Sequence, residues 1–264
     1  MIMKKFWHFV KTAWLSYKGV SLWFNLKSYI AEKVVNPVFR LLFYSFLLIY
    51  GYKTAENAVV YIIANAMLLA TISAFKGIGI IFFSERHQGT LIFSIVAPKS
   101  KFKVMVEKMP FHIIDAFLTV LMGMVIIMLF FHFSISLLSM AELFLCVITG
   151  VISISMFGML IAGLGLITRD INMLLSVAES MIFLLSGVYF PVEKLPPLLR
   201  YVSYILPLTH SVKGIKQVFS GNTSKMLFSI GMEVFLILVY LLLSFVTLKI
   251  LETKARSSGE IEFY

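Results

Sequence analysis

Six long stretches of apolar residues divide this chain, and each is about as long as a helix that crosses a lipid bilayer. They cover residues 34–52, 57–80, 110–133, 137–168, 171–189 and 226–251. A helix that spans a bilayer needs about 20 consecutive apolar residues. Hydrophobic residues make up 60% of the chain and charged residues only 14%, whereas soluble domains carry about 25% charged residues. The pattern predicts an all-α integral membrane protein with six transmembrane helices.

The lysines and arginines in the loops and at the margins of the apolar stretches, all but Arg40, predict which side of the membrane each loop faces. Sixteen of them fall on one side and six on the other, and short loops rich in positive charge stay in the cytoplasm. We therefore expect a multi-pass protein of the plasma membrane of a bacterial cell, with both termini cytoplasmic. The same rule and the anionic cytoplasmic leaflet account for the net charge of +10. The expected partner of this charge is the lipid bilayer, with no nucleic acid involved.

Residues 1–33 precede the first apolar stretch and have the pattern of an amphipathic helix. Lys4, Lys11 and Lys18 recur every seven residues. The opposite side gathers apolar side chains, namely Phe6, Trp7, Val10, Ala13, Trp14 and Tyr17. This pattern is typical of a helix that lies in the membrane interface, and an ordinary solvent-exposed helix is the alternative. We interpret 1–33 as an N-terminal interfacial helix and 34–264 as one six-helix membrane domain.

Residues 186–221 form the one long stretch on the expected exterior side. Four prolines within it exclude a single continuous helix, namely Pro191, Pro196, Pro197 and Pro207. Its many leucines and isoleucines also make it too apolar for a free loop. Short broken helices that re-enter the outer leaflet before the last span fit both facts.

A group of polar residues interrupts the chain between the second and third apolar stretches, in the sequence SERHQGTLIF at 84–93. We expect the flanking apolar side chains to rest on the membrane and the polar ones to point to the cytosol, namely Glu85, Arg86, His87 and Gln88. Gly89 allows the backbone to turn, and the Thr90 hydroxyl is placed to cap a following helical turn. Pro98 ends the segment. A rigid piece that presents charge to the cytosol suits the docking of a soluble partner.

The same segment resembles the ER-x-x-G-T-L motif in the first cytoplasmic loop of ABC-2 type transporter permeases. The resemblance lies in Glu85-Arg86, Gly89-Thr90-Leu91, the proline at Pro98 and the lysine at Lys108. A second stretch, LSGVYFPVEKLPPLLRYVSYILPLTHSVKGIKQV, is similar to the outer segment of that family. Six spans, cytoplasmic termini and an N-terminal interfacial helix agree with the resemblance, which covers nearly the whole chain.

The resemblance implies a permease subunit that forms half of a dimeric pathway, with a second copy or a related permease as the other half. Each half would dock on one of two ABC ATPase subunits through a coupling helix at 82–98, in which the coupling residues are Glu85, Arg86, Gly89, Thr90 and Leu91. The outer segment would help to close the exit side, with gate residues Gly187, Pro191, Pro196 and Pro207. Export of drugs, peptides or other amphiphiles is the implied function.

The chain lacks the phosphate-binding loop that an ATPase requires. That loop reads Gly-x-x-x-x-Gly-Lys-Ser/Thr, and the only Lys-Ser pairs, Lys27-Ser28 and Lys99-Ser100, follow Leu26 and Pro98. We therefore expect no enzymatic activity and no bound cofactor in this chain, with ATP and Mg on the partner subunit. The five histidines are scattered and Cys146 is the only cysteine, so we expect no metal site.

Two glutamates lie inside apolar stretches, where ionisable residues are costly and often functional. Glu179 could line the pathway, pair with a basic group such as Lys213, or hydrogen-bond between helices, and Glu233 is a second possible pathway residue. A rival reading is a proton-coupled secondary transporter that uses Glu179, Glu233 and Asp115 as a relay. That class usually shows more spans and inverted repeats, which are not visible here. An intramembrane enzyme is a second rival, but its metal or nucleophile motifs are absent from the sequence.

Overall fold

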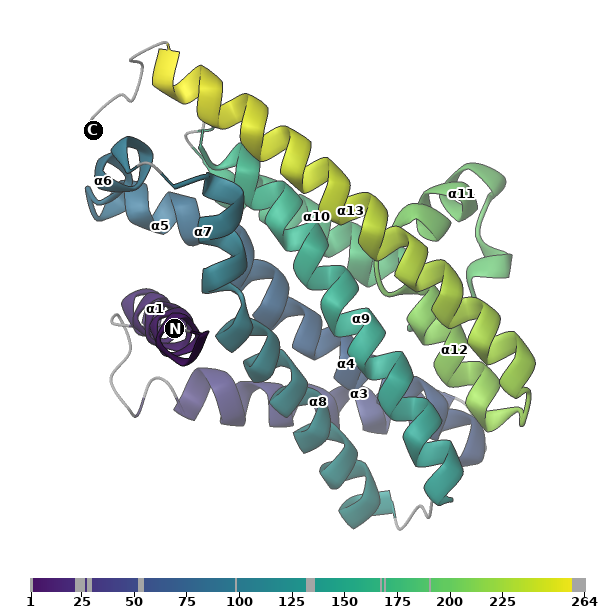
Figure 1. The fold of residues 1–264 in the computed structure, drawn as a ribbon. Helices are drawn as coiled ribbons and strands as arrows, with labels where there is room; N and C mark the ends of the chain where they lie inside the picture. Colours follow the sequence, from purple (N-terminus) through teal and green to yellow (C-terminus); the bar gives the residue numbers. More distant parts are fainter. Residues whose placement is uncertain are drawn as a thin grey trace.

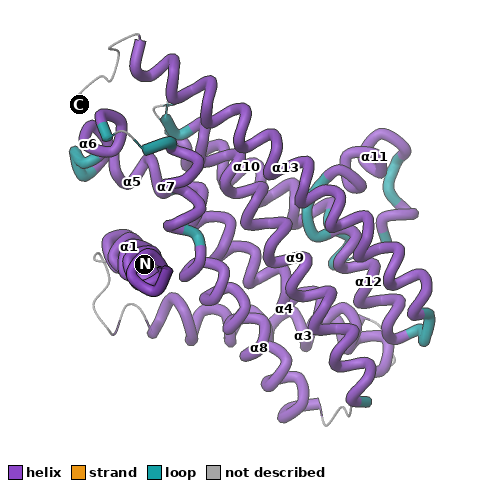
Figure 2. The backbone as a smooth tube through the Cα atoms, in the orientation of Figure 1, coloured by secondary structure: helices purple, strands orange, loops and turns teal. Residues whose placement is uncertain are grey.

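Every regular element in the described part of the chain is a helix (Figure 2). The computed structural model describes residues 2–21, 27, 30–51, 55–97, 99–131, 136–166, 168, 170–189 and 191–257. In chain order the elements are α1 Ile2–Ser21, η1 Ala31–Val35, α3 Asn36–Gly51, α4 Ala55–Gly79, α5 Ile81–His87, α6 Leu91–Val96, α7 Lys101–Lys108, α8 Pro110–Phe131, α9 Leu137–Leu164, α10 Ile171–Leu185, η2 Val192–Lys194, α11 Pro197–Ile205, α12 Thr209–Phe219 and α13 Thr223–Ser257.

Four helical stretches in the described residues are long and apolar enough to cross a membrane. They are Val60–Gly79, Lys101–Ile126, Leu137–Leu164 and Thr223–Lys254. They correspond to the second, third, fourth and sixth predicted spans, so the chain is a multi-pass membrane protein. The fifth predicted span, 171–189, contains the shorter apolar helix α10, which ends at Leu185. A total of six crossings stays a prediction.

The first predicted span, 34–52, is helical up to Gly51, but its first two residues belong to the wider π-helix η1. Asn36 donates its backbone N–H to the carbonyl of Ala31, five residues earlier. Pro37 explains this geometry, because proline has no N–H and its ring clashes with the carbonyl four residues before it. The helix widens locally by one residue and continues as α3, which packs against α4.

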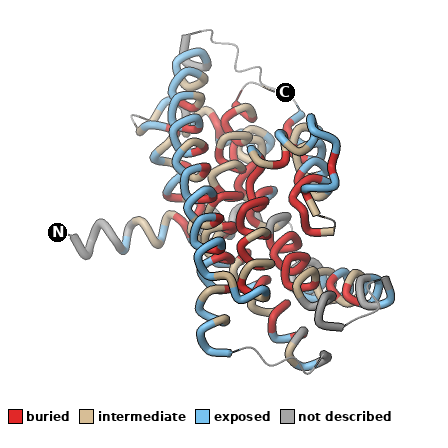
Figure 3. The backbone as a smooth tube through the Cα atoms, turned by 90° about the vertical axis from the view of Figure 1, so that its right-hand side faces the viewer, coloured by how far each residue is buried: buried red, intermediate tan, exposed pale blue. Residues whose placement is uncertain are grey.

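Small residues on α9 let this helix lie at the centre of the bundle, where it packs against α13, α4 and α12. A Cβ added to Gly158 would lie 3.2 Å from the carbonyl oxygen of Phe75 on α4. On the outside, α13 keeps an exposed apolar face along its length (Figure 3), which includes Phe228, Phe235 and Leu242. This face is suited to lipid.

The axes of the long helices are roughly aligned with one another, so the bundle has two distinct ends (Figure 1). We call the end that carries α5, α6 and the C-terminal part of α13 the inner end, and the end where α12 leads into α13 the outer end. Helix α10 starts near the inner end and stops partway through the bundle, and α12 runs beside the outer half of α13 (Figure 1).

Helix α1 projects sideways from the bundle and crosses the direction of the long helices (Figure 3). It contacts α7 and α8, with the rings of Trp14 and Phe111 centred 5.3 Å apart. Trp7 and Trp14 are 69% and 50% exposed. The interfacial interpretation of 1–33 stays a prediction, with which a helix that crosses the bundle and exposes tryptophans is compatible. Residues 1, 22–26, 28 and 29 of that segment lie outside the described residues.

Candidate functional sites at the two ends of the bundle

The polar residues of the inner end lie on two short helices joined by a tight turn. Helix α5 ends at His87, and α6 begins at Leu91. Gly89 has a φ of 68°, in the left-handed region that favours glycine, and a Cβ there would meet no atom within 4 Å. Leu91 is buried, together with Phe82 on α5, so both short helices are anchored by apolar contacts with the bundle.

Glu85 is held by an ion pair with Lys108, at the end of α7. Only 15% of each side chain is exposed. This pair connects the first residue of the motif to the lysine that completes its resemblance, 23 positions along the chain. Because both charges are largely withdrawn from water, the pair fixes the position of α5 against α7.

Arg86 reaches the carbonyl oxygens at the end of α9. Its guanidinium donates hydrogen bonds to the carbonyl of Leu166 and to that of Thr168, the latter at 2.6 Å. The last turn of α9 contains no basic residue, and cations stabilise the carbonyl end of a helix. Partial burial lowers the pKa of Arg86. Arg86 therefore ties α5 to α9 and supplies the charge that the end of α9 lacks.

Two expectations for this segment are wrong. Glu85 and Arg86 do not point to the cytosol, because Lys108 and the α9 carbonyls hold them against the protein. The Thr90 hydroxyl does not cap α6, because it donates back to the carbonyl of Glu85 at 3.2 Å. Pro98 lies outside the described residues.

The exposed part of this inner site is the turn and one face of α6. His87, Gln88, Gly89 and Thr90 are exposed, and His87 stacks on Phe83. Two large apolar side chains of α6 follow, with Phe93 75% and Val96 76% exposed. The motif thus presents a polar tip beside an apolar patch, on helices that its own charged residues hold in place.

The outer segment 186–221 is broken by its prolines, as predicted. Pro191 precedes η2, and Pro197 is the first residue of α11, where proline's missing N–H costs nothing. Pro196 is exposed and Pro207 is buried, just before α12. Gly187 has a φ of 80°. Re-entry of these helices into the outer leaflet stays a prediction.

Glu233 of α13 lies at the start of α12 and is fully buried. Its two carboxylate oxygens accept the backbone N–H of Leu208 at 3.0 Å and that of Ser211 at 2.9 Å. Leu208 has a φ of 75°, which is strained for a residue with a branched side chain. The carboxylate satisfies the free N–H groups of the helix start, where negative charge is stabilising. The capping contact of Glu233 is not among the sequence predictions, and a role for Glu233 in a pathway stays a prediction.

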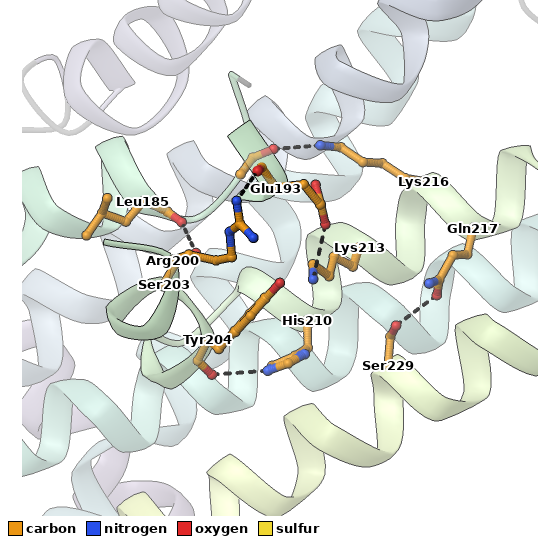
Figure 4. Close-up of polar contacts among 11 residues, drawn as sticks. Leu185, Glu193, Arg200, Ser203, Tyr204, His210, Lys213, Lys216, Gln217 and Ser229 are labelled. Carbon is orange, nitrogen blue, oxygen red and sulfur yellow. Dashed lines mark hydrogen bonds and ion pairs between the residues drawn. The ribbon is translucent and has the colours of Figure 1, made fainter. Parts of the chain in front are cut away.

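Cations gather around η2, α11 and α12 at the outer site (Figure 4). Arg200 donates to the carbonyl oxygens of Glu193 and Leu195. Lys213 pairs with the Glu193 carboxylate at 3.3 Å and lies 4.2 Å from the centre of the Tyr204 ring. Burial raises the pKa of Glu193, but its own backbone N–H and Lys213 outweigh burial, so this pKa is lowered overall.

Lys216 closes the outer segment on itself (Figure 4). Its ammonium donates to the carbonyl of Gly187 at 2.8 Å and lies 4.8 Å from the centre of the Tyr61 ring. Burial lowers the pKa of Lys216 to about 8. The first and last parts of the segment are thereby joined, with Ser203 donating to the carbonyl of Leu185 at 2.5 Å as a further connection.

Glu179 forms an ion pair with Lys76 and not with Lys213, the lysine that the sequence suggested. Its carboxylate lies 2.7 Å from the ammonium of Lys76 on α4, with 46% of the Lys76 side chain and 24% of the Glu179 side chain exposed. Lys213 instead pairs with Glu193, so a Glu179–Lys213 pair is wrong. Asp115 accepts a hydrogen bond from Ser73 at 2.6 Å. The three carboxylates of the relay hypothesis therefore have separate partners.

Within the described residues, no group of three or more His, Cys, Asp and Glu side chains is placed to hold a metal ion. Comparison with known proteins gives one family match. The family model for the ABC-2 type transporter matches residues 10–220, a range that contains α5, α6 and nearly the whole outer segment. No match was found among curated proteins.

Proposed function

Since the chain belongs to the ABC-2 type transporter family, whose members have no catalytic activity of their own, we propose that it is the permease subunit of an ATP-driven exporter. Two copies, or one copy and a related permease, would form the pathway, and each would dock on a separate ATPase subunit that binds ATP and Mg. The observation that carries the proposal is the match over residues 10–220, within which the coupling motif is rigidly anchored and partly exposed.

The surface of α6 supports contact with the ATPase subunit. Phe93 and Val96 are exposed beside the polar turn at His87–Thr90, and apolar side chains surrounded by polar ones are common at the centre of protein interfaces. Glu85 and Arg86 are positioning residues in this proposal, since they fix α5 to α7 and α9. Gly89 and Leu91 serve the same purpose through the turn and through burial. Closure of the ATPase dimer would then move α5 and α6 together with the end of α9.

Co-purification with the candidate ATPase subunit tests this coupling contact. We expect the wild-type chain to retain the subunit and stimulate its ATP hydrolysis, and Phe93→Ala with Val96→Ala to lose it while the permease stays folded. Val106→Ala is the matched control, because Val106 is 40% exposed on neighbouring α7. If the control and the double variant release the subunit equally, or if wild type never binds it, the coupling proposal fails.

Glu85→Ala and Arg86→Ala should behave differently from the α6 variants. Removing Glu85 leaves the Lys108 ammonium without a counter-charge, and removing Arg86 leaves the carbonyls of Leu166 and Thr168 without their donor. Either change loosens α5, so both binding and the melting temperature should fall. Unchanged melting temperatures would contradict the positioning role.

We place the pathway beside α4 and α10, on the face that carries Lys76 and Glu179. A partly exposed ion pair on membrane helices is costly against lipid and suits a water-filled or protein-covered face. On α10 the neighbouring exposed positions include Asn172, Ser176 and Ser180, which also suit water. Glu233, in contrast, would act on the pathway through α12.

The outer segment would close the exit, with Gly187, Pro191, Pro196 and Pro207 at its bends. Its bond to itself through Lys216 supports movement as one unit, and Ser203 connects this unit to the end of α10. The direction of transport and the substrate class, a drug, peptide or other amphiphile, rest on the family resemblance. The proposal that the inner end faces the cytoplasm, in a plasma membrane, rests on the lysines and arginines of its loops.

A further inference from the structure

A cavity of about 320 Å³ lies near the inner end, between the start of α7 and the C-terminal part of α13. This volume is within the range of about 300–1,000 Å³ that is usual for small-molecule sites. It lies apart from the α5–α6 turn and from the outer segment. Its lining combines two aromatic residues, Phe102 and Phe245, with four polar or charged ones, Ser100, Lys249, Glu252 and Thr253.

The apolar wall of the cavity adjoins the exposed apolar face of α13. Phe102 and Phe245 meet edge to face, with ring centres 5.3 Å apart. Phe245 is 43% exposed and continues the apolar face of α13. Lys249 follows one turn later and is the first charged residue after Glu233 along this helix. Such a change from apolar to basic marks the boundary between hydrocarbon and headgroups.

Helix α1 lies on the other side of α7, where Trp14 contacts Phe111 at the start of α8. It exposes Trp7 and Trp14, and tryptophans concentrate at membrane interfaces. If α1 lies in the interface, the aromatic side chains of the nearby cavity would be closer to the lipid tails and its polar side chains closer to the headgroups.

The charges around the cavity favour an anion. Lys103, Lys249 and Lys254 are exposed on the two segments that form it, whereas Lys101 is buried and donates to the carbonyl of Ser94. Glu252 directs one carboxylate oxygen to the backbone N–H of Lys101, at 3.1 Å, and Glu107 pairs with Lys99. Both acids are thus engaged within the protein, and the Lys249 ammonium is exposed.

We propose that this cavity binds one anionic phospholipid of the inner leaflet. Its phosphate would lie at Lys249, with the hydroxyl of Ser100 as a hydrogen-bond donor. One acyl chain would run over Phe245 and Phe102 and along α13. Basic pockets beside membrane helices on the cytoplasmic side are suited to such headgroups.

Native mass spectrometry of the full chain in detergent tests the proposal. The probes are phosphatidylglycerol and phosphatidylcholine with the same acyl chains. We expect wild type to retain phosphatidylglycerol in preference, and Lys249→Gln to weaken that retention about fivefold, as expected for one lysine near an anionic headgroup. Phe245→Ala should weaken it too, because the acyl chain loses its wall.

Lys225→Gln is the matched control, because Lys225 is an exposed lysine at the opposite end of α13. Equal loss in Lys249→Gln and Lys225→Gln, or equal retention of the two lipids by wild type, overturns the proposal. Displacement of phosphatidylglycerol by inorganic phosphate alone also overturns it, because the acyl chain would then contribute nothing. Unchanged melting temperatures of the variants show that the comparison concerns folded protein.

Discussion

Replacing Glu233 with alanine should release the start of α12 from α13. The carboxylate accepts two backbone hydrogen bonds, at 3.0 and 2.9 Å, in a fully buried position. A hydrogen bond to a charged group contributes about 1.5–3 kcal/mol. Loss of both therefore raises the free energy of the closed outer segment by roughly 3–6 kcal/mol. Glu233→Gln keeps one acceptor oxygen and should lose about half of that.

The assay is the rate at which a water-soluble thiol reagent labels a cysteine in α12. Val212→Cys, in a chain whose Cys146 is replaced by alanine, places the thiol at a position that is 1% exposed. Labelling then requires local opening, and each 1.4 kcal/mol changes the open fraction about tenfold. We expect Glu233→Ala to speed labelling by roughly a hundredfold or more.

Ser229→Ala provides the comparison that makes this result specific. Ser229 also connects α13 to α12, through one neutral hydrogen bond to the Gln217 side chain at 2.8 Å, which contributes about 1 kcal/mol. Its loss should speed labelling only about fivefold. If Glu233→Ala speeds labelling no more than Ser229→Ala does, the carboxylate does not hold α12.

Three further results are expected. Burial lowers the pKa of Lys216 from 10.5 to about 8, so between these pH values the unfolded chain binds more protons than the folded chain and stability rises with pH. The melting temperature of wild type should therefore rise relative to that of Lys216→Met above about pH 8. Parallel curves of melting temperature against pH for the two proteins would contradict this. Gly158→Val should cost about 1–3 kcal/mol in a thermal melt, because its Cβ meets the Phe75 carbonyl at 3.2 Å, whereas Gly231→Val, with no atom within 4 Å, should cost much less. Lys76→Gln and Glu179→Gln should each change stability by no more than about 1 kcal/mol but lower the ATPase rate of the complex, and the exchange Lys76→Glu with Glu179→Lys should restore it; no restoration would remove the pair from the pathway.

Hydropathy was enough to predict the long helices, because a bilayer imposes one length on any helix that crosses it. The stretches 137–168 and 226–251 correspond closely to α9 and α13. Prolines likewise predicted the breaks in 186–221. The π-helix before Pro37 was not predicted, because a proline also permits a kink or the start of a new helix. Only the hydrogen bond from the Asn36 N–H to the carbonyl of Ala31 identifies the π-helix.

The motif residues were found in the sequence, but the directions of their side chains were not. Arg86 lies 82 positions from Thr168, and the partner of Glu179 depends on how α4 meets α10. One signal was available for Arg86. Helix α9 has no basic residue in its last turn, so its carbonyl end needs a cation from elsewhere. For Glu233 the corresponding signal is the unfilled start of α12, whose N-cap position is Leu208 rather than a polar residue.

Helix α9 is the element that mechanically relates the two sites. At the inner end Arg86 binds the carbonyls of Leu166 and Thr168, directly after α9, so a movement of α5 that preserves these bonds pulls on the end of α9. Toward the outer end α9 lies directly against α12, where a Cβ on Gly214 would be only 2.8 Å from the sulfur of Cys146. A contact this close leaves α9 little room to slide past α12, and Glu233 binds α12 to α13. A displacement of α9 must therefore either move the outer segment as a unit or break the Glu233 contacts, and the labelling rate at Val212→Cys distinguishes these two responses.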